Sequence, residues 1–238
     1  MLLVVLEHDR GEMSDASLEG LTAGRELAAR LGLALHAVSI GADLSAAAAD
    51  FGAVLTHVVD HDLLGDYGPE AWGEAIAQLT DSLAPTVVVA CGTDRGNEVL
   101  AQVAARRDLP MVANCVDVTP GEPWTLTRTR WGGSLLEEAT LTAPLKLLTF
   151  AHHAVDAVMH PVAGETSVFV PELDPSLART VVRDRVVRVA GVTLSTARVV
   201  VGGGRGVGSA DGFAPLEALA AELSGVVGCS RAVTNNGW

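Results

Sequence analysis

ARVVVGGGRGVGSADGFAPLEALAAELSGVVGCSRAVTNNGW, from Ala197 to Trp238, contains the most specific pattern in this sequence. It opens on the β-branched run Val199–Val201, which is typical of a buried parallel strand. Glycines and one arginine fill positions 202–206, and apolar residues at helical spacing then predict a helix. A short second strand follows and ends just before Ser230 and Arg231. The stretch therefore predicts a strand, a glycine turn, a helix and a strand.

The glycine turn has two interpretations. Glycines let backbone N–H groups approach a phosphate, and a helix that begins after the turn adds favourable partial charge. Arg205, inside the turn, can pair with a phosphate through two N–H groups. The glycines do not fit the dinucleotide pattern G-x-G-x-x-G. Taken alone, the turn leaves phosphate binding and a plain tight turn open.

The whole stretch resembles the start of the flavin domain of the electron-transfer flavoprotein α subunit. The family pattern is a strand, GGRG, a serine and a phenylalanine that open a helix, and then G-x-S-R-x-x-x-x-x-G-W. The matching segments here are Gly203–Gly206, Ser209, Phe213 and GCSRAVTNNGW at 228–238. The sequence departs from the family at Asn235, where the family usually has Asp, and at Asn236, where it has a small residue.

The resemblance implies a site for FAD. It assigns Arg205, Gly206, Ser230 and Arg231 to cofactor binding, with Arg231 over the flavin ring and the Ser230 hydroxyl on the same cofactor. The family's later motifs, Q-x-G-Q-T-G and S-G-A-x-Q-H, are absent from the sequence up to Trp238. We therefore expect an incomplete FAD site in a truncated flavin domain.

The preceding residues alternate between apolar runs and amphipathic segments. This alternation predicts an α/β fold, a parallel sheet covered by helices on both faces. Ser14 has the character of a helix N-cap. The predicted strands are Leu2–Leu6, Leu33–Ile40, Val54–Val59, Thr86–Ala90 and Val112–Val118. The predicted helices are 14–31, 43–51, 69–83 and 97–107.

The pattern changes after this alternation. Trp124–Phe150 is rich in Thr, Leu and Trp and has a glycine turn at 132–133. Together with Val168–Val170 and Val181–Val189, it predicts antiparallel or crossing strands appended to the sheet. We expect an N-terminal α/β domain at 1–192 and, at 193–238, the first βαβ part of a Rossmann-like FAD-binding domain.

The opening LVVLEHDRGEMSDASLEGLTAGRELA (3–28) is also similar to the beginning of the family's α subunit. The resemblance implies a nucleotide-hydrolase-like fold that binds no nucleotide itself, with AMP in the β subunit. It further implies a redox carrier rather than an enzyme. The implied partners are a β subunit, flavin dehydrogenases as electron donors and a quinone-linked oxidoreductase as acceptor.

Composition excludes several classes of protein. Of the 238 residues 49% are apolar, which suffices for a core, and the net charge of −13 argues against nucleic acid as a partner. No apolar run approaches the length that a membrane span needs, and the first residues lack a signal peptide's basic region. Three cysteines without metal-site spacing favour a reducing compartment. We expect a cytoplasmic protein that does not insert into membranes.

Other polar clusters are given structural roles. Asp94 and Arg95, after a strand, are interpreted as an interface or a local ion pair. The adjacent His152 and His153 are expected to point to opposite sides of extended chain, which disfavours a metal site. His57 is expected to be solvated at a strand end. Two functions remain as alternatives to the redox carrier: a nucleotide-binding α/β protein, and a degenerate α subunit that has a structural role without flavin.

Overall fold

The computed structural model describes residues 1–184, 194, 197–235 and 237. It divides into two compact units, Met1–Arg183 and Asp184–Trp238. The predicted domain boundary between residues 192 and 193 lies outside the described residues. The predicted strand at Val181–Val189 falls in the same region: residues 181–184 have no regular structure, and the rest lies outside the described residues.

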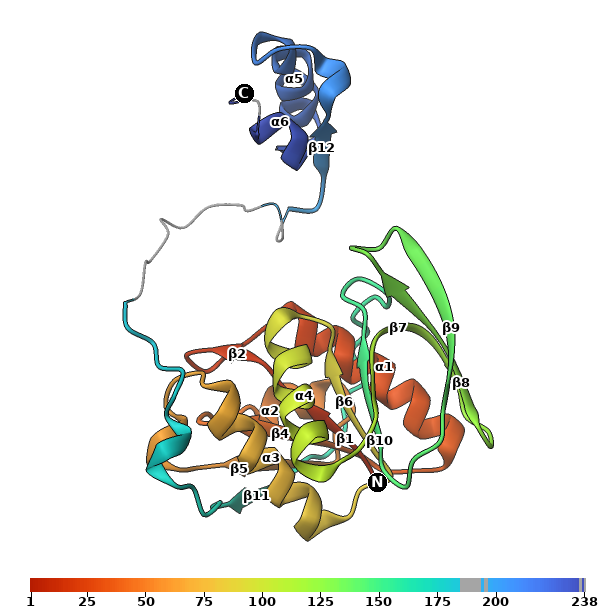
Figure 1. Ribbon diagram of the computed structural model, residues 1–238, viewed down its shortest axis with the longest axis vertical. Coiled ribbons are helices and arrows are strands. Elements are labelled where there is room, and N and C mark those ends of the chain that lie inside the picture. The colour runs from red at the N-terminus through yellow and green to blue at the C-terminus, as the bar shows by residue number, and fades with distance from the viewer. Residues whose placement is uncertain (185–193, 195–196, 236, 238) are drawn as a thin grey trace. The chain divides into compact units, whose positions relative to one another are not determined.

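The first unit is built on a mostly parallel sheet, which confirms the predicted α/β class (Figure 1). Among the described residues its nine strands lie in the order β11-β5-β4-β1-β6-β10-β7-β8-β9. Their bounds are β1 Leu2–Val5, β4 Leu35–Ile40, β5 Leu55–Val59, β6 Val87–Cys91, β7 Met111–Thr119, β8 Trp124–Arg130, β9 Leu135–Leu141, β10 Lys146–Phe150 and β11 Glu165–Phe169. A small hairpin, β2 His8–Asp9 with β3 Glu12–Met13, lies outside this sheet.

Helices cover both faces of the sheet because its central strands are apolar on both sides. Along β1, Leu2 and Val4 pack into one core with helix α1, and Leu3 and Val5 pack into another with helices α3 and α4. The helices are α1 Asp15–Leu31, α2 Ser45–Asp50, α3 Pro69–Leu83 and α4 Asp94–Arg107, with short 3-10 helices η1 Asp62–Leu64 and η2 Pro175–Leu177.

Helix starts follow local capping. The hydroxyl of Ser14 accepts a hydrogen bond from the Ser17 N–H, which confirms the predicted N-cap of α1. Helix α4 begins three residues earlier than predicted. There the Thr93 side chain caps the helix by accepting from the Gly96 N–H at 2.9 Å.

The appended β region is partly as predicted. Strands β7, β8 and β9 pair antiparallel, and β8 and β9 form a hairpin around Gly132 and Gly133. The prediction is wrong for Lys146–Phe150, which lies inside the sheet as β10, parallel to both β6 and β7. It is also wrong for Val168, because β11 pairs parallel with β5 at the opposite edge. All five residues of β10 are buried, as a strand between two parallel neighbours requires.

The second unit contains the predicted strand–turn–helix–strand segment. Strands β12 Val200–Gly203 and β13 Val226–Cys229 are parallel neighbours, connected through helix α5 Ala214–Glu222. Two 3-10 helices, η3 Arg205–Val207 and η4 Asp211–Phe213, precede α5, and α6 Arg231–Thr234 follows β13. Among the described residues the apolar side of α5 is only partly covered: Leu219, and Leu223 directly after the helix, are each 49% exposed.

Candidate cofactor site

The carboxyl ends of β12 and β13 bring the two halves of the sequence pattern together. Gly203 pairs with Cys229 across the two strands, and the Ser230 N–H donates to the Gly203 carbonyl oxygen at 3.0 Å. The turn that contains Arg205 therefore begins beside the residue that precedes Arg231. Ligands of open α/β sheets bind at this carboxyl edge.

Close packing explains one glycine of the turn. Gly203 is buried, and a Cβ there would lie 2.3 Å from a ring carbon of Phe213 and 2.9 Å from a methyl group of Leu216. Only glycine lets β12 approach the start of α5 so closely. Glycine at position 203 is therefore a packing requirement as well as part of the motif.

Packing does not explain Gly206. A Cβ there would meet no described atom within 4 Å, and Gly206 is exposed. Its backbone is not left-handed either, so neither crowding nor conformation requires glycine at this position. The absence of a side chain leaves the main chain accessible, which suits the close approach of a ligand.

The polar side chains at this edge face solvent. Arg205, Ser230 and Arg231 are all exposed, and the Ser230 side chain does not cap α6, although Ser230 occupies the N-cap position. Two guanidinium groups and a hydroxyl group are hydrogen-bond donors that suit phosphate oxygens and a ring that gains negative charge on reduction. The residues present thus fit an anionic, ring-bearing cofactor.

Polar side chains also gather in the first unit, where strands β1 and β6 end. The sequence analysis pointed to Arg95 there but not to Glu7. Glu7 follows β1 and is 9% exposed, and its carboxylate accepts from the Thr93 hydroxyl at 2.5 Å. Burial raises the pKa of this carboxyl, against the lowering effects of the Thr93 hydrogen bond and the Arg95 charge. The Arg95 guanidinium lies over the Tyr67 ring, 5.0 Å from its centroid. Glu7 could have been found from its place after a buried strand.

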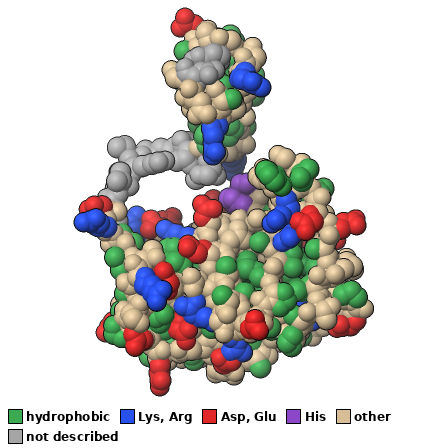
Figure 2. Space-filling view, viewed as in Figure 1, with side chains coloured by type: hydrophobic (Ala, Val, Ile, Leu, Met, Phe, Trp, Pro, Cys, Tyr) green, Lys and Arg blue, Asp and Glu red, His purple; other side chains and the backbone are tan. Residues whose placement is uncertain are grey.

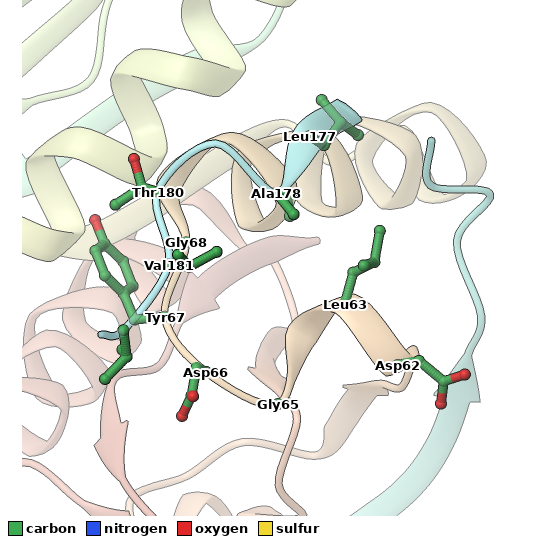
Figure 3. Close-up of a pocket in the computed structure, with 12 residues that line it drawn as sticks. Asp62, Leu63, Gly65, Asp66, Tyr67, Gly68, Leu177, Ala178, Thr180 and Val181 are labelled. Atoms are coloured by element: carbon green, nitrogen blue, oxygen red, sulfur yellow. The ribbon is translucent and has the colours of Figure 1, made fainter. Parts of the chain in front are cut away.

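A pocket of about 490 Å³ opens beside this edge, between the turn after β5 and the segment that follows η2 (Figure 3). Its lining includes Asp62 and Asp66 together with apolar Leu63, Leu177 and Val181. Neither lysine nor arginine is among the described residues that line it, and these residues offer a phosphate no positive charge.

Two histidine predictions are wrong. His57 is not solvated: it is 4% exposed and its Nε2 lies 3.1 Å from Nδ1 of His36 on the neighbouring strand. His152 and His153 do not point to opposite sides, because His153 has a left-handed backbone with φ 64° and its ring stacks on that of His152. The expectation of alternating sides holds only for extended chain.

Comparison with known families covers both units. Residues 2–178 match the sequence model of the electron transfer flavoprotein domain, and residues 193–238 match that of the electron transfer flavoprotein FAD-binding domain. The chain belongs to the electron transfer flavoprotein family. The FAD-binding match includes Arg205, Gly206, Ser230 and Arg231, which supports an association of this flavoprotein with flavin.

Relatives of this flavoprotein align over essentially its whole length. The electron transfer flavoprotein subunit alpha of Thermoanaerobacterium thermosaccharolyticum is 30% identical, over 99% of this chain and 74% of the relative. The subunit alpha of Mycobacterium tuberculosis strain H37Rv is 33% identical, over 100% of this chain and 74% of the relative. Protein FixB of Clostridium saccharobutylicum is 31% identical, over 99% of this chain and 73% of the relative. The flavoprotein is thus a redox carrier rather than an enzyme. No helix in its described part is long and apolar enough to cross a membrane.

Proposed function

We propose that this chain is the α subunit of a heterodimeric electron transfer flavoprotein. It carries electrons on FAD from flavin dehydrogenases to a quinone-linked oxidoreductase. The observation that carries the proposal is the pairing of β12 with β13, which places the Arg205 turn and Ser230–Arg231 at one edge. That edge lies in the segment that matches the FAD-binding domain.

Each residue at this edge has a distinct part in the proposal. Arg205 and the accessible backbone at Gly206 bind the cofactor's phosphates, because a guanidinium and main-chain N–H groups both favour phosphate oxygens. Ser230 hydrogen-bonds the cofactor through its hydroxyl, and Arg231 holds a fixed positive charge at the flavin ring. When bound, FAD supplies the one- and two-electron chemistry that side chains lack.

The partner subunit completes the proposal. The relatives are named as alpha subunits, and we infer a β subunit as this chain's partner. AMP is assigned to that partner, as the resemblance to the family implies. The cytoplasm is the proposed compartment, because three cysteines without metal-site spacing favour a reducing environment.

The test is flavin content after co-expression with a β subunit. Arg205→Ala is expected to weaken FAD binding by about 1.5–3 kcal/mol, the range for hydrogen bonds to charged groups. Arg198→Ala is the matched control, because Arg198 is also exposed but precedes β12 at the opposite end of the strand. FAD is measured by its absorbance and by fluorescence after release.

Two results would contradict the proposal. A purified complex that contains no flavin would favour the structural role of a degenerate subunit. ATP turnover without bound flavin would favour the nucleotide-binding alternative. Equal FAD affinity of Arg205→Ala and Arg198→Ala would remove Arg205 from the site while leaving the function standing.

A further inference from the structure

Three side chains that can bind a metal meet on the surface of the first unit. Glu19 lies in α1, and His152 and His153 lie in the turn after β10, 133 and 134 positions further along the chain. Their ligand atoms all lie within 4.8 Å of one another. Figure 2 shows histidine side chains open to solvent on this unit. We call these three residues the Glu19 cluster.

The backbone of His153 holds the cluster in place. Its N–H donates to Glu19 Oε2 at 2.8 Å, and its left-handed conformation turns the ring toward the same carboxylate. His is one of the few residues that adopt this conformation readily. The two rings then stack with centroids 3.7 Å apart and an interplanar angle of 24°. Both imidazoles therefore reach Glu19 from one side.

The second carboxylate oxygen is the shared point of the cluster. Nδ1 of His153 lies 3.1 Å from Glu19 Oε1, and Nε2 of His152 lies 3.6 Å from the same oxygen. In a tetrahedral zinc site with bonds of about 2.0–2.1 Å, neighbouring ligand atoms are roughly 3.3 Å apart. These two distances bracket that spacing, and the two ring nitrogens lie within 4.8 Å of each other, so rotation of the imidazoles would bring all three ligand atoms around one ion.

The chemistry of the donors points to a class of metal. Two imidazole nitrogens and one carboxylate oxygen suit zinc and its first-row neighbours, whereas calcium and magnesium prefer oxygen ligands alone. Carboxylates that bind metals are usually held by a further hydrogen bond from the protein. Here the backbone N–H of His153 holds Oε2 of Glu19 in this way and leaves Oε1 for the ion. The Glu19 side chain is only 13% exposed, and an ion would neutralise its charge.

We propose that Glu19, His152 and His153 form a binding site for a divalent transition-metal ion of the zinc type. The site leaves at least one coordination position for water or for a group from a partner molecule. It involves none of the residues proposed to hold FAD. A test of the metal site therefore does not depend on the proposed function.

The experiment is calorimetric titration of the untagged full chain, stripped with a chelator, with Zn²⁺ as the probe. One equivalent of Zn²⁺ is expected to bind per chain. Glu19→Gln, His152→Gln and His153→Asn should each weaken binding at least about tenfold, the loss that even outer partners of metal sites cause. Asn is chosen at 153 because it tolerates the left-handed backbone.

The matched control is His160→Gln, since His160 is an exposed histidine of the same unit outside the cluster. It should bind Zn²⁺ like the parent chain. Thermal unfolding without metal shows that each variant is folded, and Zn²⁺ should raise the unfolding temperature of the parent but not of the cluster variants. The proposal is overturned if the parent binds no stoichiometric Zn²⁺, if cluster variants bind as the parent does, or if His160→Gln weakens binding equally.

Discussion

Arg231 is the residue whose charge is expected to affect the flavin potential most directly. A guanidinium stays charged at any working pH, so it stabilises negative charge on a reduced flavin ring more than it does the neutral oxidised ring. At about 4 Å and an effective dielectric constant near 20, the attraction is roughly 4 kcal/mol before desolvation. A net 1.4 kcal/mol corresponds to about 59 mV in a one-electron couple.

We therefore expect Arg231→Ala, in the full heterodimer, to lower the first flavin potential by on the order of 100 mV. Arg231→Lys should retain part of the effect, because the charge matters more here than the guanidinium's fork. Arg198→Ala, at the other end of β12, should leave the potential unchanged. Redox titration measures all three. If both Arg231 variants stay within about 20 mV of the parent, Arg231 does not tune the ring.

The buried pair of His57 and His36 gives a prediction for pH. Desolvation, and then the proximity of His36, lower the pKa of His57 from 6.5 to about 4. The unfolded chain therefore takes up this proton first as the pH falls. The contribution of neutral His57 to the free energy of unfolding is fully present above about pH 6.5. It is lost progressively as the pH falls toward 4, by on the order of 3 kcal/mol.

Urea unfolding of His57→Gln between pH 7.5 and 4.5 should show a weaker dependence on pH than unfolding of the parent. Glu7 acts in the opposite sense, because burial raises its pKa: its contribution is present at low pH and is lost as the pH rises through the folded-state pKa. Comparison of variant with parent cancels that contribution. His160→Gln serves as the control, and parallel curves for His57→Gln and the parent would refute the assignment.

At the scale of elements, the approach of β12 to α5 depends on a single missing side chain. A Cβ at Gly203 would lie 2.3 Å from the Phe213 ring, and overpacking of this kind costs about 1–3 kcal/mol. We expect Gly203→Ala to destabilise the second unit by that amount, seen as faster amide hydrogen exchange in β12 and α5.

The adjacent Gly202 provides a matched control, because a Cβ there meets no described atom within 4 Å. Gly202→Ala should leave exchange in the second unit unchanged or slightly slower, since alanine reduces the freedom of the unfolded chain. Equal effects of the two substitutions would show that the contact with Phe213 does not limit packing.

At the scale of the whole molecule, the β8–β9 hairpin presents apolar side chains that need a cover. Trp131 is 83% exposed, Leu135 56% and Leu136 69%. Clustered apolar exposure of this kind is typical of an interaction surface. We expect a 1:1 heterodimer with a β subunit in which this hairpin contributes to the contact.

Light scattering of the co-expressed pair measures the assembly. Leu136→Lys should weaken it at least tenfold, because a charge then replaces apolar contact area. Val168→Lys is the control: Val168 is 66% exposed on β11, at the opposite edge of the sheet. Two separate monomers from the parent proteins would contradict the heterodimer, and equal loss in both variants would contradict the role of the hairpin.

Periodicity and capping, which are local properties, were sufficient to predict most of the elements. Helix α3 extends from Pro69 to Leu83 as predicted, and Trp72, Ile76 and Leu79 are buried. Its proline start and its apolar face are both patterns of residues close together in the sequence. The strand–turn–helix–strand order of the second unit followed from its glycines and apolar runs for the same reason. The family could also be identified, because GGRG and G-x-S-R stand at fixed spacing in the chain.

What the sequence by itself determined is therefore the kind of each element and the motifs they carry. Only the tertiary structure decided which strands are neighbours: β10 lies between β6 and β7, and β11 beside β5, because sheet order depends on contacts between distant residues. The same holds for side chains. Glu19 meets His152 and His153 only because the turn after β10 returns to α1, and a left-handed residue there reverses the alternation that sequence spacing assumes.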